Sequence, residues 1–575
     1  MYLPGLWAIP PVDRDESRFA QASRQMYESG DWVVPRIQDR PRLNKPPLIY
    51  WLQCAGIAVF GDRPGQYLNG NIWVFRVPSI LAAIGSVLIT WRLGMRIMAA
   101  QAACLGAALL AVCPMVVWDA HQARADQVLL LCTTGAMWAL LVVFTSREST
   151  ERTSDTPHIN GSLLFRVILF WLFLAAGILT KGPITPMVVG LTAIALCIAT
   201  RRWRWLLRLQ PLIGIVILAA AIAPWLLALV HRLAHPTAAF AAEMKLEPGA
   251  TSGWASYAKI VFDETLGRSA TAKEGHWGPP GYHLVLLVVL MWPGSLLTGL
   301  GLARAFRQAF RGCRHPPARR VVTGAVPRGA LFLLAWIIPS WVIFELISTK
   351  LPHYTMPLYP ALCLVSARAI FAAAARKLPG LRGQGTRIGF GIWLAVGAAM
   401  MLGVSALVVV AGRLDDAPLL GAGRSQYMLP AALVAIALFS AARLIARGLF
   451  VRAQLLALFA AVIWGMTSLQ LILPSARRFW LSPRIVEAVG SEAHGDRLVN
   501  RSSFTEDSLV FLTRGAVTRE GTEPSSGPQV LLLPSGQPHA PPLRLLETIR
   551  GWNYSTGREV SLDIVQRPAA EEPPP

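Results

Sequence analysis

The residues most able to do chemistry lie in the stretch from Asp13 to Leu52. It gathers carboxylates, cations and aromatic rings in a chain that is otherwise mostly apolar: Asp13, Asp15, Glu16, Arg18, Arg40, Arg42, Lys45, Trp32, Tyr50 and Trp51. Pro46 and Pro47 favour extended backbone before them, which gives the ammonium of Lys45 a fixed direction. Fixed cations can hold an anion, and a nearby carboxylate can accept a proton. A solvated loop with an interfacial aromatic belt is the alternative interpretation.

Composition places these residues in a membrane protein. The 575 residues are 54% hydrophobic with a mean hydropathy of +0.46, and many apolar runs approach the roughly 20 residues that cross a bilayer. A net charge of +22 would suggest nucleic acid binding in a soluble protein. Here the arginines lie between apolar runs, so the positive-inside rule explains them, and we expect no nucleic acid partner. The seven cysteines show neither metal-binding nor disulfide spacing.

Twelve apolar runs are predicted to be membrane-spanning helices, at 72–98, 101–118, 127–144, 162–179, 183–200, 209–230, 282–303, 329–348, 354–374, 387–411, 429–448 and 451–473. Arginine-rich loops alternate with loops that lack this excess, which predicts that the first set is cytoplasmic and the second faces outward. The segment before residue 72 then also faces outward. We therefore expect a first helix that is missing from this chain or lies upstream of Met1. Residues 47–60 are too short to span and predict an interfacial helix.

Two domains are predicted. Residues 1–474 form an all-α polytopic membrane domain with outward loops at 8–71, 119–126, 231–281 and 349–353. Residues 475–575 are more polar. There, Ser508–Leu512 and Val530–Leu533 are predicted as strands of a small outward α/β domain, and the closing A-E-E-P-P-P is typical of disorder.

The outward loops carry further ionisable residues next to apolar sequence. Asp126 stands at the edge of a span, where an ionised group needs a partner. Lys181 lies between two spans with almost no loop, although a snorkelling lysine would look the same. The other candidates are Glu264, Arg268, His276, Lys350, His353 and Tyr354. These charges could be ordinary loop charges or could solvate interfacial helices. Because tight outward turns repeatedly carry them, we expect them to converge on the outer membrane face.

Six motifs resemble those of the GT-C class of membrane glycosyltransferases. They are D-E-S-R-F-A, S-G-D-W-V-V-P, N-K-P-P-L-I-Y-W-L, L-T-K-G-P, H-W-G-P-P and K-L-P-H-Y, in this order. The likeness is to lipid A aminoarabinose transferases and protein O-mannosyltransferases, over most of residues 13 to about 375. It implies an inverting transfer of a sugar from a polyprenyl-phosphate donor to lipid A or to a protein or glycan hydroxyl. It also implies the bacterial inner membrane, with the active site facing the periplasm.

The resemblance also implies roles for individual residues. Asp15 and Asp126 match the family's two carboxylates, which predicts that they are catalytic. The residues matching those that hold the donor phosphate are Arg18, Lys45, Lys181, Arg268 and Tyr354. Further possible contributors are Glu16, Glu264, His276, Lys350 and His353. The aminoarabinose branch has a proposed Glu and His metal pair, and here Asn44 and Thr265 stand in those places. No cofactor is assigned, and a divalent metal would need other ligands.

Two other functions compete with transfer. Intramembrane charges and broken helices occur in lipid transporters and flippases, and the motifs could also persist in a non-catalytic membrane assembly protein. Against transport, the ionisable groups cluster at one face and no paired repeat of broken helices is evident. The sequence therefore favours a glycosyltransferase. It does not specify the sugar, the acceptor or the oligomeric state.

Overall fold

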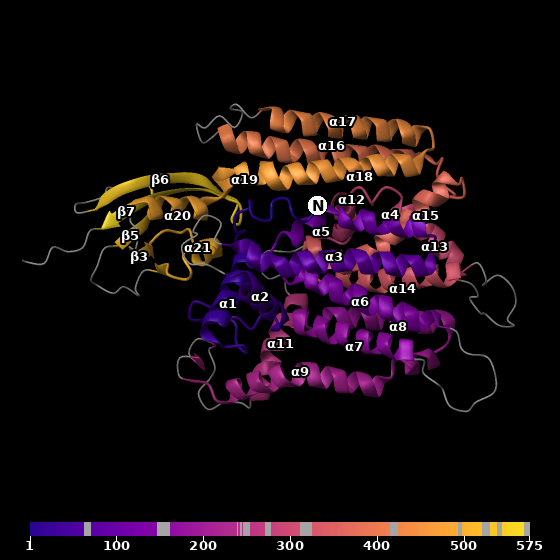
Figure 1. Ribbon diagram of the computed structural model, residues 1–575, viewed down its shortest axis with the longest axis horizontal. Helices are drawn as coiled ribbons and strands as arrows, with labels where there is room; N and C mark the ends of the chain where they lie inside the picture. The colour runs from indigo at the N-terminus through magenta and orange to yellow at the C-terminus, as the bar shows by residue number, and fades with distance from the viewer. Residues whose placement is uncertain are drawn as a thin grey trace, which may run out of the picture.

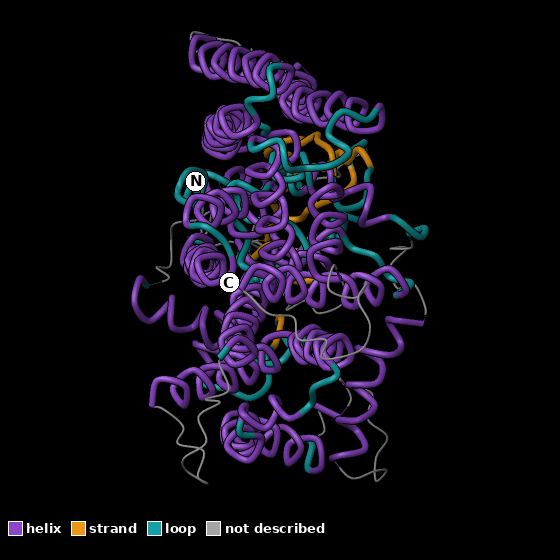
Figure 2. Tube along the Cα trace, turned by 90° about the vertical axis from the view of Figure 1, so that its right-hand side faces the viewer, coloured by secondary structure: helices purple, strands orange, loops and turns teal. Residues whose placement is uncertain are grey.

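The structure, a computed structural model, is a bundle of helices with a small mixed sheet at one end (Figure 1). Many of the helices are seen nearly end-on in Figure 2, so their axes run roughly parallel. It describes the chain except for residues 62–70, 147–160, 238–239, 242–243, 245–252, 271–277, 311–324, 414–423, 493–496, 520–528, 537–542 and 568–575. In the described part, eight helices are long and apolar enough to cross a membrane, or nine if one bent pair is a single span. The chain is thus an integral membrane protein.

These eight candidate spans all fall on predicted ones. They are Ile72–Ile97 (α3), Asp126–Thr145 (α6), Gly161–Lys181 (α7), Pro211–Ala234 (α9), Arg328–Leu346 in α14 (Ala325–Leu346), Pro352–Ala374, Met428–Ala446 in α17 (Arg424–Ala446) and Phe450–Ser475. The span Pro352–Ala374 combines the 3₁₀ turn η4 (Pro352–Leu358) with α15 (Tyr359–Ala374), and the last span combines α18 (Phe450–Thr467), a π-helical turn and α19 (Leu473–Ser475). The predicted run 387–411 lies in α16 (Gln384–Arg413). A helix bonds its own backbone, which suits it to lipid.

Three other predicted spans are short or interrupted. The run 101–118 is two helices, α4 (Ala100–Ala111) and α5 (Pro114–Ala120), which meet at 56°. The run 183–200 is the 17-residue helix α8 (Ile184–Thr200). The run 282–303 divides into α12 (Tyr282–Leu290) and α13 (Thr298–Phe310), with Pro293 between them. Proline lacks the N–H that a continuous helix would use there. The structure therefore does not establish twelve uninterrupted crossings.

The charged segment before α3 folds over one end of the bundle (Figure 1). It consists of α1 (Asp15–Ser29), the hairpin of β1 (Arg36–Ile37) and β2 (Arg40–Pro41), and α2 (Leu48–Phe60). Gly30 ends α1 in the left-handed conformation, with a φ of 69°, as is common after a helix. The 13 residues of α2 are too few to span a bilayer, which agrees with a helix lying at the interface. The helix α11 (Gly253–Ala270) packs against α9.

The C-terminal region forms the expected α/β fold. Its sheet has the order β4-β3-β5-β7-β6, with β3 parallel to β4 and β5 and the other pairings antiparallel. The strands are β3 (Arg497–Asn500), β4 (Thr518–Arg519), β5 (Gln529–Pro534), β6 (Arg544–Asn553) and β7 (Arg558–Arg567), and the helices α20 (Leu481–Glu492) and α21 (Asp507–Leu512) accompany them. The strand predicted at Val530–Leu533 is confirmed within β5. The strand predicted at Ser508–Leu512 is wrong, because these residues form α21; periodicity cannot separate strand from helix in so short an apolar run.

The most enclosed span is the one that contains α15. Of its best apolar window, 89% is buried inside the protein, and α15 packs against α3, α4, α13, α14 and α18. Its N-terminal turn η4 touches α5, α6 and α12. A helix held on all sides positions the residues at both of its ends rigidly. These are the turn before α15 and Arg368 near the C-terminus of α15.

Candidate active site

A buried carboxylate joins three spans at the end of the bundle that carries α1. Asp126 is the first residue of α6, and its Oδ1 accepts a hydrogen bond from Nζ of Lys181, the last residue of α7, at 2.5 Å. Nε2 of His353, in the turn before α15, lies 3.7 Å from the same oxygen. The second carboxylate oxygen lies 3.3 Å from Nη2 of Arg124. An ionised aspartate at the end of a span thus has the partners it needs.

Arg124 connects this buried pair with the carboxylate at the start of α1. Its Nη2 lies 3.8 Å from Oδ2 of Asp15, and its Nη1 lies 3.6 Å from Oδ1 of Asp119. Arg42, which follows β2, approaches the other oxygen of Asp15 to 4.0 Å. The side chain of Asp15 is 51% exposed, whereas those of Asp119 and Asp126 are 0% and 6% exposed. Asp15 is therefore the carboxylate of this cluster that another molecule can reach.

The surrounding cations keep Asp15 ionised. Burial raises the pKa of its carboxyl, but the charges of Arg124 and Arg42 outweigh that effect and hold the pKa below the ordinary value of 3.8. In the same way, burial lowers the pKa of the Arg124 guanidinium, and the charges of Asp126, Asp119 and Asp15 raise it above its usual range. At neutral pH, Asp15 is thus an unprotonated carboxylate that can accept a hydrogen bond or a proton.

The turn before α15 brings further predicted residues to the cluster. Nζ of Lys181 lies 5.7 Å from the ring centre of Tyr354, a cation–π distance. Lys350 is buried, and its Nζ donates a hydrogen bond to the carbonyl oxygen of Gly278 at 3.1 Å. The predicted convergence is therefore seen for Asp15, Asp126, Lys181, His353 and Tyr354, which lie together although they come from four separate segments.

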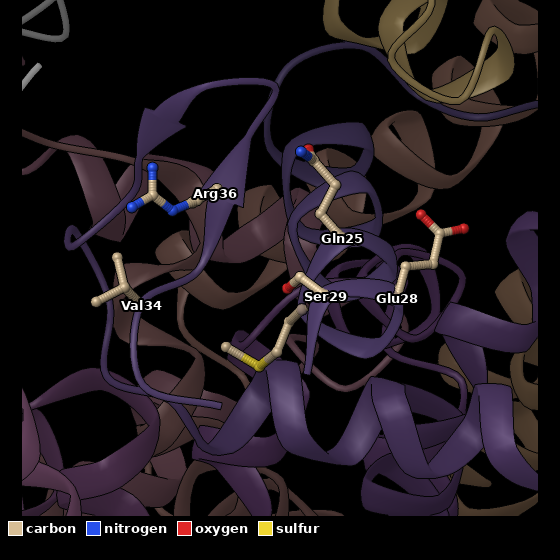
Figure 3. A pocket seen from close by; sticks show the side chains of 6 residues that line it. Gln25, Glu28, Ser29, Val34 and Arg36 are labelled. Carbon is tan, nitrogen blue, oxygen red and sulfur yellow. The ribbon is translucent and has the colours of Figure 1, made fainter. Parts of the chain in front are cut away.

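A pocket of about 320 Å³ opens further along α1 (Figure 3). It is lined by Gln25, Met26, Glu28, Ser29, Val34 and Arg36, and in Figure 3 Glu28 projects from the helix while Arg36 projects from the hairpin on the other side. Gln25 follows Asp15 by ten positions, about 15 Å along a helix. The cavity is thus separate from the carboxylates. We place the candidate site at the charge cluster, because that is where groups able to do chemistry meet.

The chain is similar in sequence to known membrane glycosyltransferases. The family described as dolichyl-phosphate-mannose-protein mannosyltransferase matches residues 44–227. Two similar relatives are the undecaprenyl phosphate-alpha-4-amino-4-deoxy-L-arabinose arabinosyl transferases of Edwardsiella ictaluri and Pseudomonas aeruginosa (strain UCBPP-PA14). Each is 28% identical, over 423 and 409 residues, which make up 73% and 71% of this chain. These matches cover 65% and 61% of the relatives, less than two thirds of their length.

The likeness extends to the fold. ArnT from Cupriavidus metallidurans bound to undecaprenyl phosphate has a TM-score of 0.65 and 17% identity, over 99% of this chain and 96% of that chain. The apo state of the same protein has a TM-score of 0.60 and 18% identity, over 98% and 95%. The predicted GT-C resemblance is confirmed. At 17% and 18% identity these structures show similarity of fold alone. The role of each residue in this chain is therefore argued from the distances and contacts described above.

Two charged residues of α1 have partners outside the cluster. Nε of Arg18 donates to Oδ2 of Asp507 in α21 at 2.7 Å. Glu16 is buried, and its two oxygens accept hydrogen bonds from Nε and Nη2 of Arg76 in α3 at 2.8 and 2.9 Å. In this structure Arg18 therefore ties α1 to the C-terminal region, and Glu16 ties α1 to the first span of the GT-C fold.

The remaining predicted residues are only partly described. Lys45 is half-buried in the loop before α2, separated from the helix by Pro46 and Pro47. The side chains of Glu264, Thr265 and Arg268 in α11 lie outside the described residues, and so does His276. The contacts proposed for these residues therefore stay predictions.

The residues present do not fit the metal pair of the aminoarabinose branch. Asn44 offers an exposed amide, and Thr265 supplies a hydroxyl, so neither brings a carboxylate or an imidazole to these places. Over the described ranges, no group of three or more His, Cys, Asp or Glu residues could hold a metal ion. We assign no reaction step to a metal, and metal dependence stays a prediction to be tested.

Arg42, Arg124 and Asp119 are central to the cluster, yet the sequence assigned none of them a role in the site. A signal was present in D-A-H-Q-A-R-A-D at 119–126, where two carboxylates and an arginine share a short link between apolar runs. Asp119 is fully buried, and among the described residues neither of its oxygens has a hydrogen-bond partner, nor does Nε of Arg124. Unsatisfied buried polar atoms are rare in proteins, and their presence beside Asp15 supports a polar ligand site.

Proposed function

We propose that this protein is an inverting glycosyltransferase of the bacterial inner membrane. It would move a sugar from a polyprenyl-phosphate donor to an acceptor at the periplasmic face. The observation that carries this proposal is the half-exposed carboxylate of Asp15, held between Arg42 and Arg124 and linked through Arg124 to the Asp126–Lys181 pair. The relatives named for undecaprenyl phosphate and 4-amino-4-deoxy-L-arabinose support a donor of that class, with a pentose as the sugar. Lipid A is proposed as the acceptor from the motif resemblance to lipid A aminoarabinose transferases.

In the proposed reaction, the bond between the anomeric carbon and the phosphate oxygen breaks, and its electron pair leaves with the phosphate. An acceptor oxygen forms the new bond on the opposite face of that carbon, so the configuration inverts. The leaving phosphate is a weak base that needs no proton, but its growing charge must be stabilised by fixed cations. Loss of one such contact typically costs about 3–4 kcal/mol of transition-state stabilisation.

The cations that could stabilise the leaving phosphate differ in whether they already lie at the cluster. Lys181 already lies at the cluster beside Tyr354. Arg18 would have to release Asp507 before it could reach a donor. Lys45 and Arg268 are proposed as further phosphate ligands from the resemblance, and a phosphate arriving from the bilayer would meet Lys45 in the loop before α2.

The role of Asp15 depends on the acceptor. A serine, threonine or sugar hydroxyl must lose its proton, and Asp15 would take that proton as general base, an effect worth about 100- to 10,000-fold in rate. A lipid A phosphate is already anionic and needs no base. In that case, Asp15 and Asp126 would orient the donor, for example through an amino group on its sugar.

The test is mass analysis of lipid A, lipids and envelope glycoproteins from cells with and without the gene, complemented by wild type, Asp15→Asn or Asp39→Asn. Asp39 is an exposed carboxylate in the same outward segment and serves as the matched control. We expect wild type and Asp39→Asn to restore one sugar-modified species and Asp15→Asn to fail. A sugar missing from lipid A phosphate would identify an aminoarabinose-type enzyme, and one missing from hydroxyls would make Asp15 the general base.

The same cells separate the competing functions. If no envelope component differs, transfer is not the function, and transport or assembly takes its place. Translocation of a donor lipid that survives Asp15→Asn would support a flippase. Each strain also needs equal amounts of folded protein in the membrane, so that loss of the modified species is not loss of the protein.

A further inference from the structure

A half-buried arginine, Arg368, lies near the C-terminal end of α15, far from the active site. Arg368 follows Tyr354 by fourteen positions, about 20 Å along a helix. Its Nη2 donates to Oε1 of Gln308 in α13 at 2.8 Å. Its Nη1 is buried and has no hydrogen-bond partner among the described residues. A guanidinium within a membrane span is costly unless something compensates its charge.

Among the residues that the structure describes, Arg368 forms no ion pair with a carboxylate. Between Glu274 and Asp415, the sequence contains a single acidic residue, Glu345. The elements packed against α15 are α3, α4, α13, α14, α18 and η4, and Glu345 in α14 is again their only Asp or Glu. Its oxygens accept from the backbone N–H groups of Gly281 and His283 at 3.2 Å. These lie at the start of α12, near the turn that carries the active-site residues.

A second arginine stands beside the first. Arg304 precedes Gln308 by one turn of α13, and its Nη1 donates to the carbonyl oxygen of Lys377 at 3.0 Å. Arg304, Gln308 and Arg368 line a cleft of about 10 Å³. This is about enough for one water-sized group, so the cleft could admit a single oxygen of a larger anion, with the rest of that anion at its mouth.

The cleft lies where an anionic lipid could reach it. In Figure 1, α13 is at the end of the bundle opposite α1 and the sheet, and the arginine-rich loops predict that this end is cytoplasmic. On α13, Phe306 and Phe310 are 55% and 37% exposed, with ring centres 4.7 Å apart. These phenylalanines are offset by two positions from Arg304 and Gln308, so α13 carries an exposed apolar face in addition to the face that lines the cleft. A helix with both faces favours a ligand that has both an acyl chain and a negative charge.

We propose that Arg368, with Arg304 and Gln308, binds the phosphate group of an anionic phospholipid in the inner leaflet. Guanidinium groups form bidentate, charge-assisted hydrogen bonds with phosphate oxygens. Basic pockets between spans on the cytoplasmic side are suited to acidic headgroups. The bound phosphate gives Nη1 of Arg368 an acceptor and supplies the negative charge that the surrounding helices lack. The site is distinct from the donor site at the other end of α15.

The experiment titrates the purified full chain in detergent with phosphatidylglycerol, phosphatidylcholine or inorganic phosphate and follows the unfolding temperature. Wild type is compared with Arg368→Gln and with Arg447→Gln, a control that removes an exposed arginine from the turn between α17 and α18. We expect phosphatidylglycerol alone to raise the unfolding temperature of wild type and Arg447→Gln. Arg368→Gln should bind it at least about tenfold more weakly, as expected for loss of a charged hydrogen bond.

Three results would overturn the proposal. Equal responses of wild type and Arg368→Gln would remove Arg368 from any lipid site, and equal effects of phosphatidylcholine would show that charge is not recognised. An equal shift with inorganic phosphate would show a phosphate-ion site in place of a lipid site. If Arg368→Gln does not fold, Arg304→Gln and Arg368→Lys carry the same test. Arg304→Gln removes one of the two cations, and Arg368→Lys keeps the charge but removes the bidentate guanidinium contact with phosphate.

Discussion

Arg124 holds three carboxylates at distances of 3.3 to 3.8 Å, those of Asp15, Asp119 and Asp126. Lys181 and Arg42 supply two more cations, so in the fully ionised cluster three negative charges face three positive ones. A donor phosphate would add negative charge to this balance. Further cations must then come from outside the cluster, which gives a physical reason for the phosphate roles proposed for Lys45 and Arg268.

The charge of Arg124 should govern the pH dependence of transfer. Because Arg124 holds the pKa of Asp15 below 3.8, Asp15 stays ionised down to that pH, and we expect a flat rate between pH 7 and pH 5. Arg124→Gln removes the cation, so the pKa of Asp15 rises and the rate should begin to fall at a higher pH. The measurement is the initial transfer rate against pH, with purified protein.

The matched control is Arg232→Gln, which removes a cation that pairs with Asp31 and is 46% exposed. It should leave the pH profile unchanged. If the transfer rate of Arg124→Gln begins to fall at the same pH as that of wild type, Arg124 does not set the protonation of Asp15, and its role is structural only.

The pair of Asp126 and Lys181 should behave as one unit. Both side chains are largely buried, 6% and 15% exposed, and removing one partner of such a pair leaves an uncompensated charge at a cost of about 3–5 kcal/mol. We expect Asp126→Asn and Lys181→Met each to destabilise the protein by that amount. The double variant should lose less than the sum of the two. Denaturant unfolding in detergent measures all three.

An exposed pair provides the comparison. Arg477 and Glu487 are 65% and 49% exposed, and Glu487→Gln should cost at most about 1 kcal/mol. Strict additivity of the Asp126 and Lys181 variants would contradict the proposed coupling between them.

Part of the charge cluster around Asp15 can be predicted from the sequence, and part of it cannot. Asp15, Asp126, Lys181 and Tyr354 could be expected near one another, because each lies in or beside a predicted outward segment and in or near a motif of the GT-C resemblance. The position of Arg18 could not be foreseen, since its partner Asp507 lies 489 positions away and depends on how the C-terminal region docks. Arg124 is visible in the sequence of its loop. Only its distances to Asp15, Asp119 and Asp126 distinguish it from an ordinary loop charge.

Among the elements, α7 and α8 meet through small residues close to the site. A Cβ atom on Gly177 would lie 2.4 Å from Oγ1 of Thr185, and that hydroxyl is 3.0 Å from Oγ1 of Thr133 in α6. Small residues allow membrane helices to approach this closely. Gly177 precedes Lys181 by one helical turn, so this packing sets where the ammonium group lies.

Gly177→Ala should therefore affect both stability and transfer. The added methyl must push α7 away from α8, and such overpacking typically costs about 1–3 kcal/mol. The shift would move Lys181 from Asp126 and reduce the transfer rate. The measurements are unfolding in detergent and the rate of sugar transfer, each compared with wild type.

Gly190→Ala in α8 is the control, since no atom lies within 4 Å of where its Cβ would stand. That change should leave transfer intact and stabilise the helix by about 0.5–1 kcal/mol. Equal behaviour of the two variants would show that close packing at Gly177 does not position Lys181.

Hydropathy predicted the positions of the apolar helices better than it predicted whether each helix is continuous. The runs at 72–98 and 127–144 became single helices, α3 and α6. The run at 282–303 broke around Pro293, and 101–118 bent between α4 and α5. Mean hydropathy measures how apolar a segment is, and a bent or interrupted helix can be as apolar as a straight one.

Across the whole molecule, α1 links the C-terminal region to the membrane cluster. Arg18 binds Asp507, and Nη1 of Arg24 donates to the carbonyl oxygen of Phe511 at 2.7 Å while its guanidinium lies 4.1 Å from that ring centre. Asp13, two positions before Asp15, accepts a hydrogen bond from Oγ of Ser508. Because α1 begins at Asp15, a change in how the C-terminal region docks on α1 would shift the position of Asp15.

Asp13 should make this docking depend on pH. Burial raises the pKa of Asp13 from 3.8 to about 7, against the opposing effect of the hydrogen bond from Ser508. Between these values the native state holds a proton that the unfolded chain has lost, so stability should fall as pH rises from about 4 to 7. Asp13→Asn keeps a neutral side chain and should lose less stability over this window, whereas Asp39→Asn should follow wild type. Thermal unfolding and limited proteolysis of the C-terminal region at pH 5 and pH 8 measure the difference.

The same pH dependence in wild type and Asp13→Asn would mean that Asp13 is already ionised in the native protein. The C-terminal domain would then dock on α1 independently of the protonation of Asp13.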